Sequence, residues 1–284
     1  MVISRADKAR AAGALAALLI FAGCAGRNNW TTDHPDIAAR AQANPQGFVE
    51  PAVAQWSDIA GVAGSYQMRV AKGIGRGSAD LAISARRPAD LDIELLGPSG
   101  ATEAILRANQ YEIGLAFAED RVIYRGPSAG AAFEKALGFD LSAADAVAVL
   151  LGYGMTDADR GRAATTWDAD ARRVHVAAPG VQAWLHPVTQ RFDRILHSDG
   201  RDTVDAMIRS WQPKPPIPDQ IRLEVEPDGY SIELSLSGPP TVNPDFPAGF
   251  FDVEVFPGFE VRPLSELAAE GGLFRRAAPT EGAQ

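Results

Sequence analysis

The chain has 284 residues, of which 46% are hydrophobic and 22% are charged, as in a soluble globular protein with a sizeable core. The formal net charge of −9 argues against a nucleic-acid-binding protein, which would present a basic face. The acidic balance also gives no broad attraction to anionic lipid headgroups, so any membrane contact requires apolar groups or an anchor.

The N-terminal segment has the pattern of a secretory signal. Three basic side chains precede an apolar run at residues 11–22, which is too short to span a bilayer as a helix. The run ends in small residues, and Cys24 follows as the only cysteine of the chain. We therefore predict that residues 1–23 form a signal peptide.

The end of this segment resembles the lipobox of bacterial lipoproteins, in which the cysteine thiol receives a diacylglyceryl group. The resemblance implies a lipidated Cys24, and Ala25 in place of an Asp favours the outer membrane. The alternative is an ordinary secretory signal beside an incidental thiol. Residues 24–48 are mostly small or polar, which indicates a flexible tether. We expect a lipid-anchored protein in the cell outer membrane that faces the periplasm.

The next part of the chain predicts strands. From Tyr66 onward, apolar and polar residues alternate, as in residues 81–85, 91–95 and 111–117. Similar runs return between residues 165 and 236. Strands with one apolar and one polar face are typical of an antiparallel sheet that is covered on one side.

Two short helices interrupt the strands. The period becomes helical over residues 128–139 and 141–152, with Ser142 as N-cap and Gly152 as a C-terminal stop. The second helix is small and apolar almost all round. It is therefore either a core helix or a lid over a lipid cavity.

This order of elements predicts a mainly β fold with α-helices. The architecture is an open, incomplete antiparallel β-barrel of about 11 strands, with short helices covering an apolar cavity. We assign this half-barrel domain to residues 49–262. Residues 263–284 are expected to be a C-terminal tail.

The sequence contains no catalytic signature. The four histidines, His34, His175, His186 and His197, lack the spacing of metal ligands, and no G-x-S-x-G nucleophile motif occurs. We therefore predict no catalytic residue, no cofactor and no metal site. A periplasmic enzyme is the hypothesis with the least support.

Four segments occur in a recognisable order: LDIELLGPSGATEAILRANQ, RVIYRGPSAGAAFEKALGFDLSAADAVAVLLG, QRFDRILHS and PPIPDQIRLE. Together they resemble the LolB-like family of outer-membrane lipoprotein-localisation factors, within the LolA/LolB-like superfamily. The resemblance implies a half-barrel whose helices close an apolar cavity that binds the acyl chains of lipoproteins or other lipid. It also implies a periplasmic LolA-like carrier as a partner and release of the cargo into the outer membrane.

In the family, the hairpin that corresponds to GPSG carries a protruding apolar residue, typically Leu, that helps to engage the membrane. The corresponding loop here is Pro98, Ser99 and Gly100, with Ser99 at the protruding position. A serine cannot supply the roughly 1.5–3 kcal/mol that burial of a Leu side chain contributes. The chain is therefore expected either to bind a different lipid or to serve in assembly.

Strand alternation and the apolar helices give the candidate lining residues of the cavity. These are Leu81, Ile83, Leu91, Ile93, Leu95, Ile113, Leu115, Phe133, Val147, Leu150, Trp184, Ile232 and Leu234. The alternative is that they pack against one another as a dry core. The two main hypotheses are therefore a lipid- or lipoprotein-binding acceptor and a structural or assembly lipoprotein with a filled interior.

Overall fold

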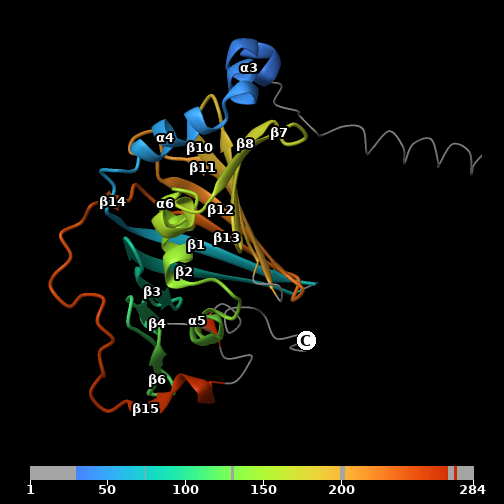
Figure 1. The fold of residues 1–284 in the computed structure, drawn as a ribbon. Coiled ribbons are helices and arrows are strands. Elements are labelled where there is room, and N and C mark those ends of the chain that lie inside the picture. The colour runs from blue at the N-terminus through green and yellow to red at the C-terminus, as the bar shows by residue number, and fades with distance from the viewer. Residues whose placement is uncertain (1–29, 74, 129–130, 199–201, 268–271, 274–284) are drawn as a thin grey trace, which may run out of the picture.

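The computed structural model describes residues 30–273, apart from 74, 129–130, 199–201 and 268–271. These residues form one 15-stranded, strongly curved sheet, with helices α5 and α6 against one face (Figure 1). The strands are β1 (Gly61–Lys72), β2 (Gly75–Arg86), β3 (Asp90–Leu96), β4 (Thr102–Ala108), β5 (Glu112–Phe117), β6 (Val122–Pro127), β7 (Ala164–Asp168), β8 (Arg173–Ala178), β9 (Val181–His186), β10 (Arg191–Ser198), β11 (Thr203–Trp211), β12 (Pro218–Glu226), β13 (Tyr230–Leu236), β14 (Thr241–Val242) and β15 (Glu260–Pro263).

The sheet is open. Its spatial order is β15-β6-β5-β4-β3-β2-β1-β13-β12-β11-β10-β9-β8-β7, with β14 beside β1. The strand pairs of the described residues are antiparallel, except that β15 runs parallel to β6. Because β15 and β7 are the two ends of this order, the barrel is incomplete, and the predicted fold class is confirmed. The sheet has more strands than expected from the sequence, partly because β14 and β15 are too short to show a periodic pattern.

The helices lie in two groups and a C-terminal turn. They are α2 (Trp30–Asp33), α3 (Pro35–Ala43) and α4 (Gln46–Ala54) before the sheet, α5 (Ala131–Leu137), α6 (Ala143–Leu151) and α7 (Asp157–Arg160) between β6 and β7, and the 3-10 turn η1 (Leu264–Glu266). The two helices predicted in the middle of the chain are confirmed as α5 and α6.

The flexible tether expected over residues 24–48 is wrong from Trp30 onward, where the chain is helical. Trp30 is 5% exposed, and its ring centroid lies 5.2 Å from that of His186 and 6.2 Å from that of Trp167. Burial of an indole among other rings stabilises the segment against the sheet. This tertiary contact outweighs the polar composition on which the expectation rested.

A segment rich in Pro and Phe covers part of the outer face of the sheet, the face opposite α6. We call residues 244–259 the C-terminal strap. Val253 of the strap packs against Ala116 and Ile123, and Phe250 lies 5.6 Å from the guanidinium carbon of Arg107. In Figure 1 this part of the chain runs along the sheet in orange and red between β14 and β15.

The strap leads into β15, which pairs with β6 at the edge of the sheet. Pairing covers β6 and leaves the four-residue β15 as the edge, and so short an edge strand offers little backbone for association with other chains. After β15, Leu264 and Leu267 are 2% and 4% exposed. The tail expected from residue 263 therefore begins as packed structure, because these leucines contact the core.

Candidate functional site: an apolar hollow beneath helix α6

Helix α6 has the boundaries that its sequence predicts. The Ser142 hydroxyl accepts a hydrogen bond from the backbone N–H of Asp145 at 3.1 Å, which caps the N-terminus. Gly152 ends the helix with a φ of 75°, a left-handed conformation that favours glycine. The residues between these caps are mostly buried, so α6 packs on nearly all sides.

An apolar hollow of about 30 Å³ lies beneath α6. The end of α5, the α5–α6 connection, helix α6 and strands β2, β3, β12 and β13 enclose it. Its lining residues are Ile83, Ile93, Leu137, Phe139, Leu141, Ala146, Val149, Leu150, Leu223 and Leu234. Since all these side chains are apolar, the site suits a hydrocarbon group and disfavours a polar one.

Four of the predicted lining residues border this hollow: Ile83, Ile93, Leu150 and Leu234. Eight others are buried in the same core cluster without bordering it: Leu81, Leu91, Leu95, Ile113, Leu115, Phe133, Val147 and Ile232. The alternation therefore assigned these strand residues to the correct face. Their contact with a ligand stays a prediction.

Trp184 is the exception, because the structure places it on the outer face. Its ring stacks on that of His175 with centroids 4.8 Å apart, and its indole N–H donates to Asp168 at 2.9 Å. The core-facing positions of β9 are odd-numbered, as the buried Ala183 and Leu185 show. A strand has period two, so an even-numbered residue on β9 faces outward however large it is.

Six lining residues were not predicted: Leu137, Phe139, Leu141, Ala146, Val149 and Leu223. The alternation of Ile221, Leu223 and Val225 would have identified the strand residue. The α5–α6 connection has no regular period, so the sequence carries no signal that its side chains close one end of the hollow.

The hollow is nearly closed. Sites for small organic ligands have volumes of about 300–1,000 Å³, ten times or more the volume beneath α6. Entry of an acyl chain therefore requires α6 to move away from the sheet. The two ends of the helix are held differently, and this difference determines which end moves.

The C-terminal end of α6 is tightly packed. A Cβ at Gly152 would lie 2.5 Å from the Trp211 ring, and a Cβ at Gly154 would lie 2.8 Å from the Phe192 ring. Trp56 lies between these two rings, with centroid distances of 6.2 Å to each. This end of the helix has no room to shift.

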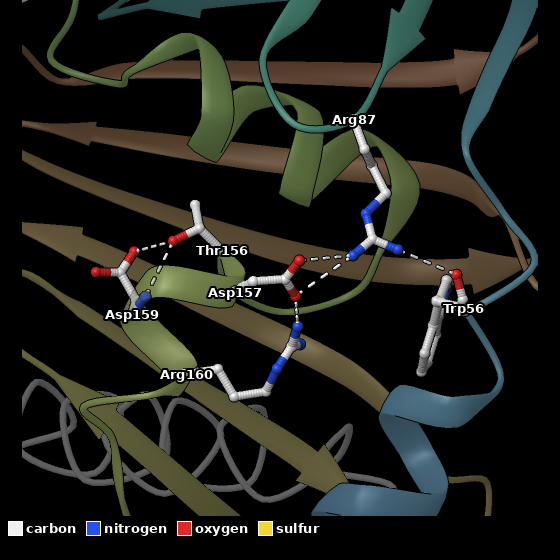
Figure 2. A network of polar contacts seen from close by, with 6 residues as sticks. All are labelled: Trp56, Arg87, Thr156, Asp157, Asp159 and Arg160. Atoms are coloured by element: carbon white, nitrogen blue, oxygen red, sulfur yellow. Dashed lines mark hydrogen bonds and ion pairs between the residues drawn. The ribbon is translucent and has the colours of Figure 1, made fainter.

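A polar network adjoins the same end (Figure 2). Arg87, in the β2–β3 turn, donates to the Asp157 carboxylate at 3.0 Å and to the Trp56 carbonyl at 3.2 Å. The Arg87 guanidinium also lies 4.7 Å from the centroid of the Tyr153 ring. Asp157 receives a further hydrogen bond from Arg160. The network ties α7 and the chain after α6 to the sheet and to the chain after α4.

The N-terminal end of α6 borders a polar hollow of about 240 Å³. His197 on β10 is 7% exposed there, and its Nδ1 lies 3.7 Å from the Asp145 carboxylate. Its Nε2 is buried and has no hydrogen-bond partner within the described residues. This end lacks the close ring packing of the other, so we expect α6 to open here, with residues 152–154 as the fixed side.

Acidification is expected to weaken the fold through His197. Burial lowers the pKa of His197, and the Asp145 and Asp159 carboxylates oppose this shift only in part. In the unfolded chain, His197 takes up a proton below about pH 6.5, whereas in the native state its imidazole stays neutral to lower pH. The free energy of unfolding therefore decreases as pH falls below about 6.5. The slope is at most about 1.4 kcal/mol per pH unit for one histidine.

Denaturant unfolding between about pH 7.5 and pH 5.5 measures this effect. The His197→Phe variant should show a shallower decline of the unfolding free energy than the original protein. His186, whose pKa burial lowers to about 4, contributes equally to both proteins and cancels in the comparison. Identical slopes would contradict the assignment.

The predicted membrane loop is an exposed turn between β3 and β4. Two backbone hydrogen bonds of 2.8 Å close it over residues 97–101, and Gly100 has a φ of 78°. Ser99 is exposed at this turn, and its role at a membrane stays a prediction. Cys24 and the predicted signal peptide lie outside the described residues.

Two features are absent from the described residues. Nowhere in this part of the chain do three or more His, Cys, Asp or Glu side chains gather as they would around a metal ion. None of the helices in the same part is both long and apolar enough to cross a membrane.

No protein-family model and no curated protein matches the sequence. Among solved structures, a DUF1329 family protein from Desulfovibrio piger has a TM-score of 0.52 and 9% identity, over 73% of this chain and 96% of that one. A putative outer membrane lipoprotein-sorting protein domain from Vibrio parahaemolyticus has a TM-score of 0.50 and 9% identity, over 72% and 95%. A LolA superfamily protein from Nitrosomonas europaea has a TM-score of 0.49 and 11% identity, over 73% and 97%. At these identities, the likeness to the two structures with TM-scores of 0.52 and 0.50 establishes a shared fold.

Proposed function

We propose that this protein is an outer-membrane-anchored lipoprotein that binds the acyl chains of lipoproteins or other lipids beneath α6. Its role would be lipoprotein localisation or lipid transfer, with a periplasmic LolA-like carrier delivering the cargo. The observation that carries the proposal is the wholly apolar hollow between a curved sheet and a helix that is firmly packed at one end. The lipobox-like ending at Cys24 and the shared fold support it.

The geometry gives the binding step a physical basis. When α6 opens, its apolar face and the inner face of β2, β3, β12 and β13 both lose their cover. An acyl chain that enters covers both surfaces again, and burial of about ten methylenes contributes on the order of 8 kcal/mol before ordering costs. The protein would act as a binder rather than an enzyme.

A second candidate is a structural or assembly lipoprotein of the envelope. The volume of about 30 Å³ favours it, because a core that is filled in this way leaves no space for a ligand without rearrangement. The two candidates differ in one measurable property, which is uptake of an acyl chain.

The test is a substitution on the floor of the hollow, which is its sheet side. A large side chain there blocks the site whether α6 is closed or open. Ile93 on β3 is 4% exposed and borders the hollow. In Ile93→Trp the larger ring occupies the space of the ligand, and affinity for a fluorescent diacylated peptide should fall about tenfold or more, by analogy with the cost of overpacking. Fluorescence titration measures the affinity.

Glu94→Trp is the matched control, since Glu94 is next along the same strand and lies on the other face. It should bind the peptide as the original protein does. Leu234→Gln is a second variant on the floor of the hollow, and it introduces a smaller side chain than tryptophan. Thermal unfolding confirms that each variant is folded. Equal affinities of Ile93→Trp and Glu94→Trp would contradict binding beneath α6.

A further inference from the structure

A second hollow lies on the outer face of the sheet, near the β1–β2 turn. Its volume is about 600 Å³, and it spans strands β1, β2, β12 and β13. Val70 of β1 is buried in the core, so its neighbours Arg69 and Ala71 point to the opposite face. This hollow is therefore separate from the apolar one beneath α6.

Short side chains form the floor of this outer hollow, and long basic ones surround it. Ala71 pairs with Ser231 on one side and with Arg76 on the other. Arg69 and Arg222 also line the hollow. The result is a depression with three guanidinium groups around a floor of small residues.

The charge of the outer hollow is opposite to that of the whole protein. Its three arginines and its single acidic residue, Glu233, give a formal charge of 3 − 1 = +2, whereas the chain carries −9. Glu233 accepts a hydrogen bond from Gln220, and Arg222 donates to Glu224 at 2.5 Å. Arg76 is exposed and makes no ion pair with any residue that the structure describes.

We propose that this outer hollow binds a phosphate group, carried by a lipid headgroup or by a soluble phosphate compound. Guanidinium groups bind phosphate oxygens through paired, charge-assisted hydrogen bonds. Three of them around a concave floor match the several oxygens of a tetrahedral phosphate better than a single planar carboxylate.

The position of the hollow favours the headgroup as the source. Leu96, at the end of β3, pairs with Asp80 in the middle of β2, so the chain leaves β3 in the direction of the β1–β2 turn. The exposed turn at residues 97–101 and the β1–β2 turn therefore point to the same end of the sheet. A membrane surface at this end would meet the exposed turn and the arginines together.

The test uses the full chain carrying Cys24→Ser, so that the predicted anchor does not contribute. The probes are inorganic phosphate, followed by calorimetry, and phosphatidylcholine vesicles with and without phosphatidylglycerol, followed by flotation. Arg76→Gln should weaken binding of at least one probe about tenfold, the effect of losing one hydrogen bond to a charged group. Arg209→Gln, on β11 outside the hollow, removes the same charge and should have no effect.

Ser78→Trp is the second variant, because it fills the hollow and keeps every arginine. It should weaken binding as Arg76→Gln does. A response to vesicles assigns the site to a headgroup, and a response to inorganic phosphate alone assigns it to a soluble compound. Binding of neither probe, or equal weakening in Arg76→Gln and Arg209→Gln, would overturn the proposal. Acyl binding beneath α6 is measured separately, so failure of one proposal leaves the other standing.

Discussion

Arg107→Met is expected to lower the free energy of unfolding by about 3–5 kcal/mol, the typical cost of leaving a buried charge without its partner. Asp92 is 3% exposed, and its carboxylate accepts a hydrogen bond from the Arg107 Nε–H at 2.7 Å. Phe250 of the C-terminal strap covers the guanidinium. Met keeps much of the side-chain volume but removes the charge, so the variant isolates the electrostatic loss.

Acidification should restore part of this loss. Burial raises the pKa of Asp92, and Arg107 opposes that effect. Without Arg107, the pKa of Asp92 in the native state rises further above its value in the unfolded chain. The variant therefore loses stability as pH rises through this native pKa of Asp92, and it regains stability as pH falls. Urea unfolding at two pH values measures both effects.

Arg125→Met is the matched control on β6, which β5 separates from β4 in the same sheet. The Arg125–Glu112 ion pair is 2.5 Å long, but its side chains are 33% and 35% exposed. Water screens such a pair, and we expect a loss below about 1 kcal/mol. Equal losses in the two variants would mean that the strap does not bury the Arg107 pair in solution.

Gly152→Ala is expected to cost about 2–5 kcal/mol, from two sources. The left-handed backbone costs a non-glycine residue about 1–2 kcal/mol, and the φ of Gly152 is 75°. The added Cβ would also lie 2.5 Å from the Trp211 ring, and overpacking of this kind costs about 1–3 kcal/mol. Denaturant unfolding gives the sum.

Gly229→Ala separates the two sources. Gly229 also has a left-handed backbone, with a φ of 68°, but no atom lies within 4 Å of its added Cβ. This variant should lose only the backbone contribution of about 1–2 kcal/mol. If the two variants lose the same amount, the C-terminal end of α6 is not tightly packed and cannot be the fixed side of an opening helix.

Local periodicity predicted much of the fold. Residues 81–85 and 91–95 alternate because one face of β2 and β3 lies against the core, and the structure confirms both strands and their facing. The caps of α6 were predictable because Ser142 and Gly152 act on adjacent backbone atoms. The burial of Trp30 was not predictable, because it depends on contact with His186, a residue far along the chain.

The candidate site was predictable only on its strand side. Ile83, Ile93 and Leu234 follow from alternation, which assigns a face to each strand residue. The α5–α6 connection has no period, so the closure of the hollow by Phe139 and Leu141 depends on tertiary packing alone. The outer hollow depends on cross-strand neighbours, and register is not readable from a single strand.

Native mass spectrometry combined with lipid extraction tests the central claim most directly. The sample is the protein without its lipid anchor, measured as purified and after incubation with a diacylated peptide. The account predicts an acyl-bearing ligand at one per protein, which is lost in Ile93→Trp and retained in Glu94→Trp. A protein that is empty as purified and also fails to take up the added peptide would contradict acyl binding beneath α6 and favour the assembly lipoprotein with a filled core.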